Sequence, residues 1–466
     1  MNRRAFFQTG IAAAMPQTGT SQTAVPSKLK SRPSKSIASS PLSIGFETLD
    51  RKMFDPDRTY THLADLGVKW ARCQTGWART EQKRGEYDFA WLDSVVDNLR
   101  KIGIQPWFNV GYGNRLYTPG APHESAVGWA PLNSPEAQQA WLKYVGKLAQ
   151  HFASRVSHFE IWNEPNIPNF WQPDKSDPAR YVDLVRMTVP VIRKAIPKCT
   201  LIGGVFAGFP VLDFADGCFA AGLGKLVDKV SYHPYRAVPE ANYEAELRAF
   251  RGLIHRYKPG MPVWQGENGA PSLPNSTGAL SDLQWDETRQ AKWLLRRILT
   301  DLNLEVELTS YFHSVDLVNY IWTTGQSQQT NSKGVLRGTD YTPKPSYFAY
   351  QNVCALFDGE TKHADFLLRV AGSVTTSTAM FVRKGCPIYA WWQPANLQEP
   401  FTPSKTRISA WHGSGARLEN PVLIDMLSGP ITVPAKVTRN GGSWNLTDVP
   451  LHDYPILLTD KSLIDS

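Results

Sequence analysis

The chain has 466 residues, of which 42% are hydrophobic and 20% charged, and this length favours a large domain plus a smaller one over a single core. Six of the 50 lysines and arginines lie within residues 1–40, which contain no acidic residue, so the remaining 44 face 42 acidic residues. Because a nucleic-acid-binding protein keeps a basic surface on its folded part, this balance argues against a nucleic-acid partner.

Residues 1–40 differ in character from the rest of the chain. Arg3 and Arg4 precede the short apolar run Gly10–Met15, which resembles a twin-arginine export signal. A disordered basic tail is the alternative. Residues 16–40 are rich in Ser, Thr, Pro, Gln and Lys, a composition that predicts a flexible tether. We therefore expect a periplasmic or secreted protein, and no apolar stretch approaches the roughly 18 residues of a membrane span.

Eight short apolar runs follow, and each predicts a buried β-strand. These runs are Leu42–Leu49, Val68–Gln74, Ile104–Val110, Val156–Trp162, Thr200–Phe206, Lys229–His233, Pro262–Gly266 and Val306–Phe312. Segments with apolar residues at helical spacing separate and follow them. These segments are Thr59–Leu66, Ala90–Ile102, Pro135–Arg155, Pro178–Ile196, a helix within Leu212–Leu226, Tyr243–Tyr257, Glu287–Leu302 and Lys344–Leu356.

The alternation of eight strands with eight helices predicts an α/β fold, a closed (β/α)8 TIM barrel over residues 41–358. A doubly wound open sheet is the alternative, but no glycine-rich GxGxxG follows the first strand. Residues 359–466 change in texture, with short β-type runs separated by Gly, Pro, Asn and Asp. Those runs are Ser377–Arg383, Pro387–Gln393, Pro421–Asp425, Ser443–Leu446 and Tyr454–Leu458. They predict a small antiparallel domain resembling a β-sandwich.

Cysteine and tryptophan bear on the kind of site. The five cysteines are widely spaced without a CxxC pair, which argues against a disulfide framework and against a zinc cluster. We expect buried free thiols and no metal or organic cofactor. The 16 tryptophans suit stacking on sugar rings, but tryptophan fills barrel cores equally well.

The segment His158–Asn166 reads HFEIWNEPN and gives the sharpest signal for a catalytic group. An apolar strand runs directly into Asn-Glu-Pro, so Glu164 projects at the carboxyl end of strand four, where barrel active sites lie. A simple strand-to-loop turn is the alternative. Glu160 lies four residues earlier on the same face of the strand. We expect it deep in the barrel, paired with a cation such as Lys69 or Arg72.

A second glutamate, Glu267, follows the apolar run of strand seven in the sequence VWQGENG. A Gly-Glu-Asn-Gly turn alone is weak evidence for a catalytic glutamate, because such turns usually mark only a loop. The position of Glu267 three strands after Glu164 makes the evidence stronger. Glycoside hydrolysis commonly uses one protonated and one ionised carboxyl group on either side of the scissile bond. A retaining pair requires a separation of about 5–5.5 Å, and we expect the nearby charge of Glu267 to raise the pKa of Glu164.

The motif WNEPN and the run Gly85–Phe89 before the second helix resemble glycoside hydrolase clan A, and most closely family 39 and its relatives. The resemblance covers about residues 42–357. It implies a retaining glycoside hydrolase that acts on oligosaccharides or polysaccharides, with Glu164 as acid/base and Glu267 as nucleophile. It leaves the sugar, the linkage and the oligomeric state open.

The same resemblance assigns roles to four more residues. Asn163 matches an asparagine that binds the sugar 2-hydroxyl, and Arg72 matches an arginine that contacts the nucleophile. His233 and Tyr235 match a strand-six cluster that orients both carboxylates. Structural roles, an internal ion pair for Arg72 and a packed turn for the His-Pro-Tyr sequence, are the alternatives.

Further sugar contacts are expected from the strand ends and loops, although ordinary loop packing explains each of them equally well. The clan often has a tryptophan at the end of strand eight, and here Phe312, His313 or the loop residue Trp322 would replace it. The other candidates are Glu47, Asp50, Asn109, Tyr112, Trp129 and Trp171.

Two other functions fit a barrel. An inert sugar-binding barrel would keep the aromatic residues but should lack one carboxylate or the arginine, and all are present. A phosphate-binding barrel needs glycine-rich loops after strands seven and eight, and only Gly266 and Gly269 are available there.

Overall fold

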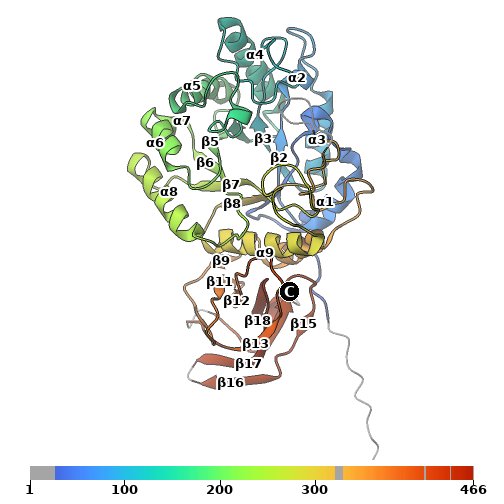
Figure 1. Ribbon diagram of the computed structural model, residues 1–466, viewed down its shortest axis with the longest axis vertical. Coiled ribbons are helices and arrows are strands. Elements are labelled where there is room, and N and C mark those ends of the chain that lie inside the picture. Colours follow the sequence, from blue (N-terminus) through green and yellow to red (C-terminus); the bar gives the residue numbers. More distant parts are fainter. Residues whose placement is uncertain (1–26, 321–328, 414–415, 441, 465–466) are drawn as a thin grey trace, which may run out of the picture.

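A computed structural model describes residues 27–320, 329–413, 416–440 and 442–464. Its first domain is a closed barrel of eight parallel strands in the order β1 to β8, and pairing of β1 with β8 closes it (Figure 1). The strands are β1 Leu42–Gly45, β2 Trp70–Gln74, β3 Gln105–Val110, β4 His158–Ile161, β5 Thr200–Ala207, β6 Lys229–His233, β7 Val263–Asn268 and β8 Leu308–Tyr311. The (β/α)8 fold expected from the sequence is confirmed.

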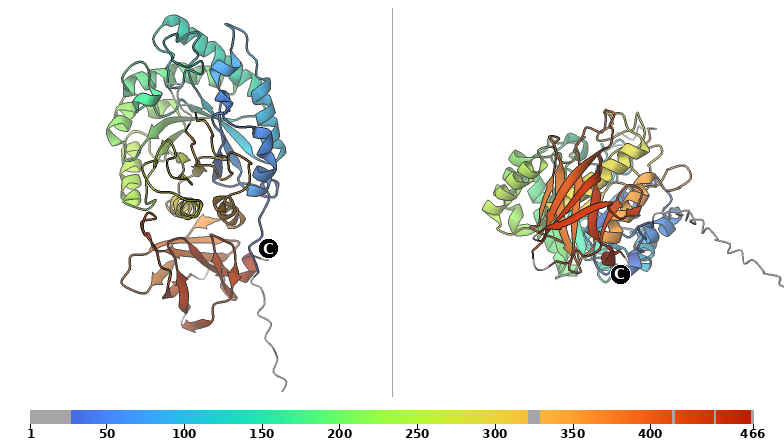
Figure 2. Two further views of the ribbon diagram at one scale, coloured as in Figure 1. Left: turned by 45° about the vertical axis from the view of Figure 1, so that its right-hand side comes forward. Right: turned by 90° about the horizontal axis from the view of Figure 1, so that it is seen from below.

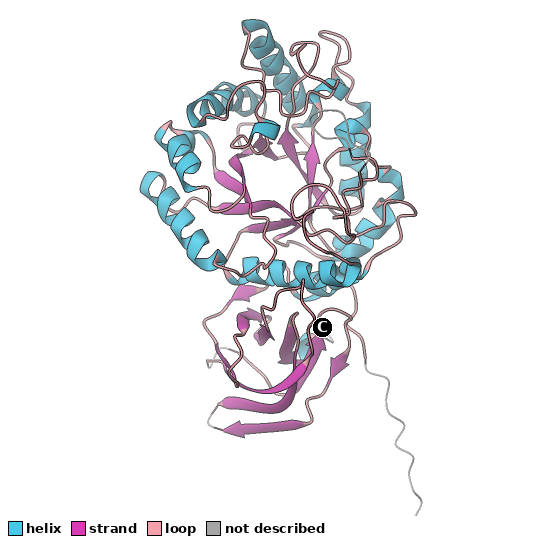
Figure 3. Ribbon diagram, viewed as in Figure 1, coloured by secondary structure: helices cyan, strands magenta, loops and turns pink. Residues whose placement is uncertain are grey.

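An outer ring of helices covers the barrel (Figure 3). Several begin at the side-chain caps that the sequence offers, as Ser134, Asp177 and Asp286 each accept a hydrogen bond from the third residue that follows. The helices are α1 Tyr60–Leu66, α2 Trp77–Thr80, α3 Ala90–Lys101, α4 Pro135–Phe152, α5 Pro178–Ala195, α6 Leu212–Ala220, α7 Leu223–Leu226, α8 Tyr243–Tyr257, α9 Glu287–Asn303 and α10 Pro345–Leu356.

Most element boundaries of the barrel differ from the expectations by one to three residues, and three of its elements differ more substantially. The helix within 212–226 is divided into α6 and α7 because Gly222 takes a left-handed conformation with φ 101°. Strand β1 ends at Gly45, four residues early, and a short 3-10 turn occupies Leu49–Arg51. Strand β7 continues to Asn268, so Glu267 lies within the strand, beside a register shift between Gln265 and Asn268.

The second domain consists of two antiparallel sheets, ordered β10-β13-β17-β16 and β15-β14-β18-β12-β11-β9. The antiparallel domain expected after the barrel is thus present. Five of its strands, β9, β10, β13, β15 and β16, were not expected. The strands are β9 Lys362–His363, β10 Leu367–Val370, β11 Ser377–Arg383, β12 Cys386–Trp392, β13 Ser404–Trp411, β14 Pro421–Asp425, β15 Ile431–Thr432, β16 Lys436–Asn440, β17 Ser443–Leu451 and β18 Ile456–Asp460.

The second domain packs against the side of the barrel that α9 forms, below the barrel in the view of Figure 1 (Figures 1 and 2). Polar contacts connect the domains: Arg296 of α9 donates to the carbonyl of Ala395, and Trp392 donates to Glu240. Lys292 of α9 forms an ion pair with Asp453 at 2.8 Å.

The prediction of a flexible tether over residues 16–40 is wrong for residues 27–40. Ser34 and Ile37 are buried, and the Ser34 hydroxyl donates to the carbonyl of Leu63. Arg32 pairs with Asp358 at 2.6 Å. The segment is polar in sequence, yet the barrel surface satisfies its polar groups and orders it. The expected export signal, Arg3 to Met15, lies outside the described residues.

Tryptophan serves mainly the interior, since eight of the 16 tryptophans are among the largest fully buried side chains. All five cysteines are buried and free, as expected. Over the described ranges, no helix is both long enough and apolar enough to cross a membrane.

Candidate active site

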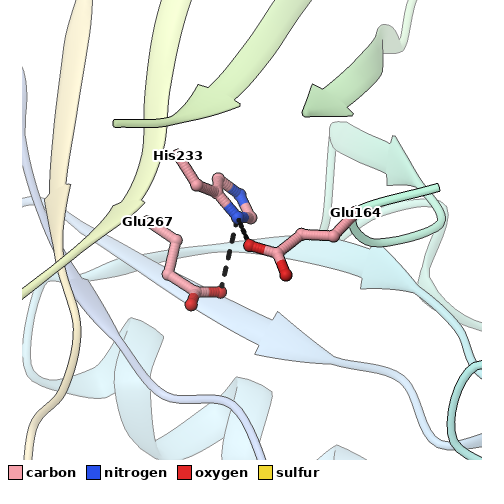
Figure 4. A group of neighbouring side chains, drawn as sticks. All are labelled: Glu164, His233 and Glu267. Carbon is pink, nitrogen blue, oxygen red and sulfur yellow. Dashed lines mark hydrogen bonds and ion pairs between the residues drawn. The ribbon is translucent and has the colours of Figure 1, made fainter. Parts of the chain in front are cut away.

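Two glutamates face each other at the carboxyl ends of the barrel strands (Figure 4). Glu164 follows β4, and Glu267 lies near the end of β7. His233, the last residue of β6, lies between them with its Nδ1 atom 2.7 Å from Glu164 Oε1 and 3.9 Å from Glu267 Oε2. One carboxyl oxygen of each glutamate and one nitrogen of His233 all lie within 4.8 Å of one another. The two carboxyl groups are therefore close enough to act on one substrate bond.

The backbone at the exit of β4 places Glu164 through two unusual conformations. Trp162 has φ 70° and Glu164 has φ 46°, both in the left-handed region that non-glycine residues rarely occupy. The surrounding structure holds them there, because the indole of Trp162 donates to the carbonyl of Phe170 and the amide of Glu164 donates to the carbonyl of Val205. Such local strain persists only where neighbouring contacts stabilise it, and it concentrates at functional sites.

Arg72 of β2 connects the carboxyl groups of the site. Its Nη1 atom donates to Glu267 Oε2 at 2.6 Å and to Glu47 Oε1 at 3.2 Å. Its Nε and Nη2 atoms donate to Glu160 Oε2 at 2.8 and 2.5 Å. The pairing of Glu160 with a cation is thus confirmed for Arg72. Lys69, the other candidate, donates to backbone carbonyls instead.

Asn163 and Tyr235 have positions consistent with the roles expected for them. Asn163 Oδ1 accepts from Arg72 Nη2 at 2.8 Å, which fixes the orientation of the amide beside Glu164. The Tyr235 hydroxyl donates to Glu267 Oε1 at 2.9 Å. Glu267 thereby accepts at both oxygens, from an arginine and from a tyrosine, and is held in one orientation.

Burial sets the protonation of the groups around the site. It raises the pKa of Glu164 to about 7, with a further increase from the charge of Glu160 and an opposing effect of Arg72. The like charge that we expected from Glu267 is not the main cause. Burial also raises the pKa of Glu47 to about 8 and lowers the pKa of His233 to about 4. At neutral pH His233 is therefore uncharged, and Glu164 is partly protonated.

Several expected sugar contacts have internal partners instead. Asn109 is fully buried and donates to Glu160 Oε2 and to the carbonyl of Trp162. Trp171 is 2% exposed and packs edge-on against Trp162 and Tyr181, so it offers no sugar platform. The prediction that Asn109 and Trp171 contact the sugar is therefore wrong, because the amide is hydrogen-bonded and the indole is packed within the protein.

The remaining candidates divide in the same way. His313 is fully buried and contacts the carbonyls of Val315 and Glu47, so it supports the base of the site. The hydroxyl of Tyr112, 2% exposed, accepts from Gln74, which leaves little of it to a ligand. Phe312 is 6% exposed. Trp322 lies outside the described residues.

Two cations near the site were not expected from the sequence. Lys333, in the connection after β8, is buried, and burial lowers its pKa to about 7 while Glu267 favours its charge. Arg51 pairs with Asp50 and donates to Gln74 at 3.0 Å. No local motif marks either residue, because each reaches the site through a loop that the sequence does not place.

A cleft of about 670 Å³ lies on the strand 1–3 side of this end of the barrel. Loops after β1, β2 and β3 supply its walls, including Arg51, Arg79, Arg115 and His123. Neither glutamate is among the residues that line this cleft, to which the segment after β1 contributes Asp50 and Arg51.

Glu164, His233 and Glu267 could also be considered as metal ligands, since each offers one ligand atom in the cluster. The guanidinium of Arg72 already occupies Glu267 Oε2 and places a positive charge beside it. A cation would compete with this bond, so the donor set fits a proton-transfer pair better than a metal centre.

A closed barrel with facing carboxyl groups after β4 and within β7 has the arrangement of glycoside hydrolase clan A. Residues 60–366 match the model of glycosyl hydrolases family 39, and the chain belongs to that family.

Curated relatives agree with this assignment. A beta-xylosidase of Caldicellulosiruptor saccharolyticus is 25% identical over 334 residues, which are 65% of this chain and 64% of that protein. A beta-xylosidase of Geobacillus stearothermophilus is 25% identical over 190 residues, which are 37% and 36% of the two chains. The chain thus spans less than two thirds of the length of each.

Solved structures show the same fold. A family 39 glycoside hydrolase from Bacteroides cellulosilyticus WH2 has a TM-score of 0.66 and 21% identity, with 92% of this chain and 81% of that chain covered. A monomeric beta-xylosidase from Caulobacter crescentus CB15 has a TM-score of 0.61 and 17% identity, with coverage of 92% and 98%. The coverage includes the second domain as well as the barrel.

Proposed function

We propose that the protein is a retaining glycoside hydrolase that cleaves O-glycosidic bonds of oligosaccharides or polysaccharides, with Glu267 as nucleophile and Glu164 as acid/base. The observation that carries this proposal is the approach of one oxygen from each glutamate to within 4.8 Å. Retaining pairs lie about 5–5.5 Å apart, whereas inverting pairs lie about 6.5–9.5 Å apart to admit a water molecule. The spacing therefore favours double displacement.

In the first step a carboxylate oxygen of Glu267 attacks the anomeric carbon. The bond from that carbon to the departing oxygen breaks, and protonated Glu164 transfers its proton to the departing oxygen. In the second step water attacks the anomeric carbon, the bond to Glu267 breaks, and Glu164 takes the proton of the water. Both glutamates end in their starting states.

The surroundings support this division of roles. Arg72 and Tyr235 donate to opposite oxygens of Glu267, which holds the carboxyl group in one orientation and stabilises it as the leaving carboxylate of the second step. Burial raises the pKa of Glu164 to about 7, so this carboxyl group can hold a proton in the pH range where Glu267 attacks.

The sugar is the finer part of the proposal. Two curated relatives are beta-xylosidases, so we propose a β-xyloside as the first substrate to test. A panel of aryl β-glycosides should include the xylo, gluco and galacto sugars and a uronic acid, since loop contacts to hydroxyls decide among them.

The experiment that tests the proposal is proton NMR of the first product formed from the best aryl β-glycoside. We expect the β-anomer to appear first and to mutarotate later. Initial formation of the α-anomer would contradict retention. Glycan binding without turnover across the panel would instead favour the inert sugar-binding barrel.

We further propose export through the twin-arginine signal at Arg3 and Arg4. Changing both to lysine should keep a fused periplasmic reporter inside the cell, because the receptor reads the arginine pair. Unchanged export of the double variant would refute this proposal.

A further inference from the structure

Three buried polar atoms in the barrel interior have no hydrogen-bond partner among the described residues. They are Oε1 of Glu160, Oγ of Ser231 and Nε2 of His233, and all three side chains are fully buried. Unpaired polar atoms in a protein interior are costly, so three of them near one another require an explanation.

The three atoms converge on one side of Gly266. A Cβ atom added there would lie 2.2 Å from Ser231 Oγ, 3.1 Å from Glu160 Oε1 and 3.4 Å from His233 Nε2. Any residue other than glycine would place carbon in the space that these polar atoms surround. Nε2 of His233 is the ring nitrogen that is not bonded to Glu164, and in Figure 4 it lies on the side of the ring away from the carboxyl groups of Glu164 and Glu267.

We propose that this space, the Gly266 pocket, binds one structural water molecule that fixes the tautomer of His233 and makes Ser231 a positioning residue for Glu164. A buried water typically makes about three hydrogen bonds to otherwise unpaired groups, which is the number offered here. The water site stands on the geometry alone, and only its effect on Glu164 rests on the proposed hydrolase function.

The direction of each hydrogen bond follows from the partners. Glu160 is the partner of Arg72 in a fully buried ion pair at 2.5 Å, and both oxygens of a carboxyl group in an ion pair are acceptors. The water donates one proton to Glu160 Oε1, donates the other to His233 Nε2, and accepts from the Ser231 hydroxyl. Each of the three unpaired atoms then has a partner, and every proton in the pocket has an acceptor.

The opposite tautomer leaves a donor without a partner. If His233 carried its proton on Nε2, it would donate to the water, and the second water proton would go to Ser231 Oγ. The hydroxyl proton of Ser231 would then lack an acceptor among the described residues. The pocket therefore selects the tautomer with the proton on Nδ1.

This tautomer determines how Glu164 holds its proton. The Nδ1–H group of His233 donates to Glu164 Oε1 at 2.7 Å, which leaves the acidic proton on Oε2 and directed to the substrate. In the other tautomer, Nδ1 would accept the proton of Glu164 and draw it away from the departing oxygen. A neutral ring is required for this role, and burial lowers the pKa of His233 to about 4.

The tautomer is tested directly by nitrogen NMR of protein labelled with ¹⁵N-histidine at neutral pH, with His233 assigned by the resonance lost in His233→Gln. We expect Nε2 of His233 without a proton and Nδ1 with one. A high-resolution crystal structure should show one water within hydrogen-bond distance of Glu160, Ser231 and His233. A protonated Nε2, or density without a water, would overturn the proposal.

Variants of the pocket test its effect on Glu164. Ser231→Ala removes one partner of the water, and Gly266→Ala combined with Ser231→Ala replaces the water by a methyl group without the clash at Ser231 Oγ. We expect kcat on substrates with poor leaving groups to fall about tenfold, since general acid catalysis contributes at least that much. Substrates with good leaving groups should change less than twofold, and KM should stay constant.

Ser310→Ala is the matched control, because Ser310 is a buried barrel serine that donates to Ser43 away from the pocket. It should leave both substrate classes unchanged. Equal losses in Ser310→Ala and Ser231→Ala, or a loss independent of the leaving group, would contradict a positioning role. NMR and crystallography need no turnover, so an inactive wild-type protein would refute the proposed function without deciding the water site.

Discussion

At the level of single residues, Arg72 is the positive charge around which the carboxyl groups of the site are arranged. Its guanidinium contacts the carboxyl groups of Glu47, Glu160 and Glu267. The carboxyl group of Glu164 lies within 4.8 Å of that of Glu267. A single positive charge cannot balance four carboxylates in a buried site. Burial reduces the excess by raising the pKa of Glu164 to about 7 and that of Glu47 to about 8, so near neutral pH Glu47 is mostly protonated and Glu164 is partly protonated.

The pH dependence of catalysis should report the proton on Glu164. Its pKa is raised to about 7, so the acid form persists well above its usual range and is lost as the pH rises through about 7. We expect kcat/KM for a glycoside with a poor leaving group to fall on that basic side. In Glu164→Ala, a substrate with a good leaving group should no longer show this decline. A basic limb that stays the same in Glu164→Ala would assign the titration to another group.

Glu267→Ala should abolish turnover, because no carboxylate remains to attack the anomeric carbon. Azide should partly restore the cleavage of an activated β-glycoside and give a glycosyl azide of inverted configuration. Glu47→Ala is the control, since Glu47 contacts the same arginine but is only 1% exposed. Azide should not restore activity to Glu47→Ala. Rescue of Glu47→Ala by azide, or no rescue of Glu267→Ala, would count against Glu267 as nucleophile. The anomeric configuration of the glycosyl azide shows from which face azide attacks.

At the level of elements, the turn at the exit of β4 carries Glu164, the proposed acid/base. Trp162 and Glu164 both take left-handed conformations in this turn, and the side chain of Glu164 lies 2.7 Å from Nδ1 of His233. The buried indole of Trp162 holds this turn by donating to the carbonyl of Phe170 at 2.7 Å. Packing and one hydrogen bond therefore stabilise a backbone geometry that local preference disfavours.

Trp162→Phe should separate stability from activity. Loss of the N–H donor leaves a buried carbonyl unpaired and should cost about 1–3 kcal/mol of unfolding free energy. We also expect kcat to fall at least about tenfold, because a small displacement of a catalytic group has a large effect. Trp391→Phe removes a similar bond, to the carbonyl of Pro450 in the second domain, and should lower only stability. Equal kcat in the two variants would contradict the role assigned to the turn.

The sequence predicts the barrel well because its strands are continuous apolar runs with clear helical segments between them. It also places Glu164 and Glu267, since strand ends of a parallel barrel meet at one rim. It fails for β13, Ser404–Trp411, where Lys405 and Arg407 interrupt the apolar pattern because this strand has an exposed face.

Side-chain partners are the part of the site that the sequence could not supply. Asn109 and Trp171 looked like sugar contacts because they lie near strand ends, but burial and internal bonds remove them. Lys333 reaches the vicinity of Glu267 through a long connection after β8, and only the folded chain brings the two together. The pocket at Gly266 depends on three strands and has no local motif.

For the whole molecule, the second domain is joined to the barrel through buried charge. Arg296 of α9 pairs with Glu240 at 2.7 Å and donates to the carbonyl of Ala395, and Trp392 donates to the same glutamate. One guanidinium therefore contacts both domains, which favours unfolding of the two as a single unit.

Arg296→Ala should leave Glu240 partly buried without its cation. We expect a loss of about 3 kcal/mol or more in unfolding free energy and the appearance of a separate transition for the second domain in calorimetry. Arg289→Ala, on the same helix, removes a half-exposed pair with Asp286 and should cost at most about 1 kcal/mol. A single transition of unchanged midpoint in Arg296→Ala would show that other contacts hold the domains together.

The most direct measurement is covalent trapping of the nucleophile with an activated 2-deoxy-2-fluoro β-glycoside, followed by mass spectrometry of the digested protein. The fluorine slows the release of the glycosyl group, so the intermediate accumulates. We expect one added sugar, carried by the peptide that contains Glu267, and faster loss of the label when a second sugar acceptor is supplied. A label on another residue, or inhibition without covalent addition, would contradict the pairing of Glu164 and Glu267.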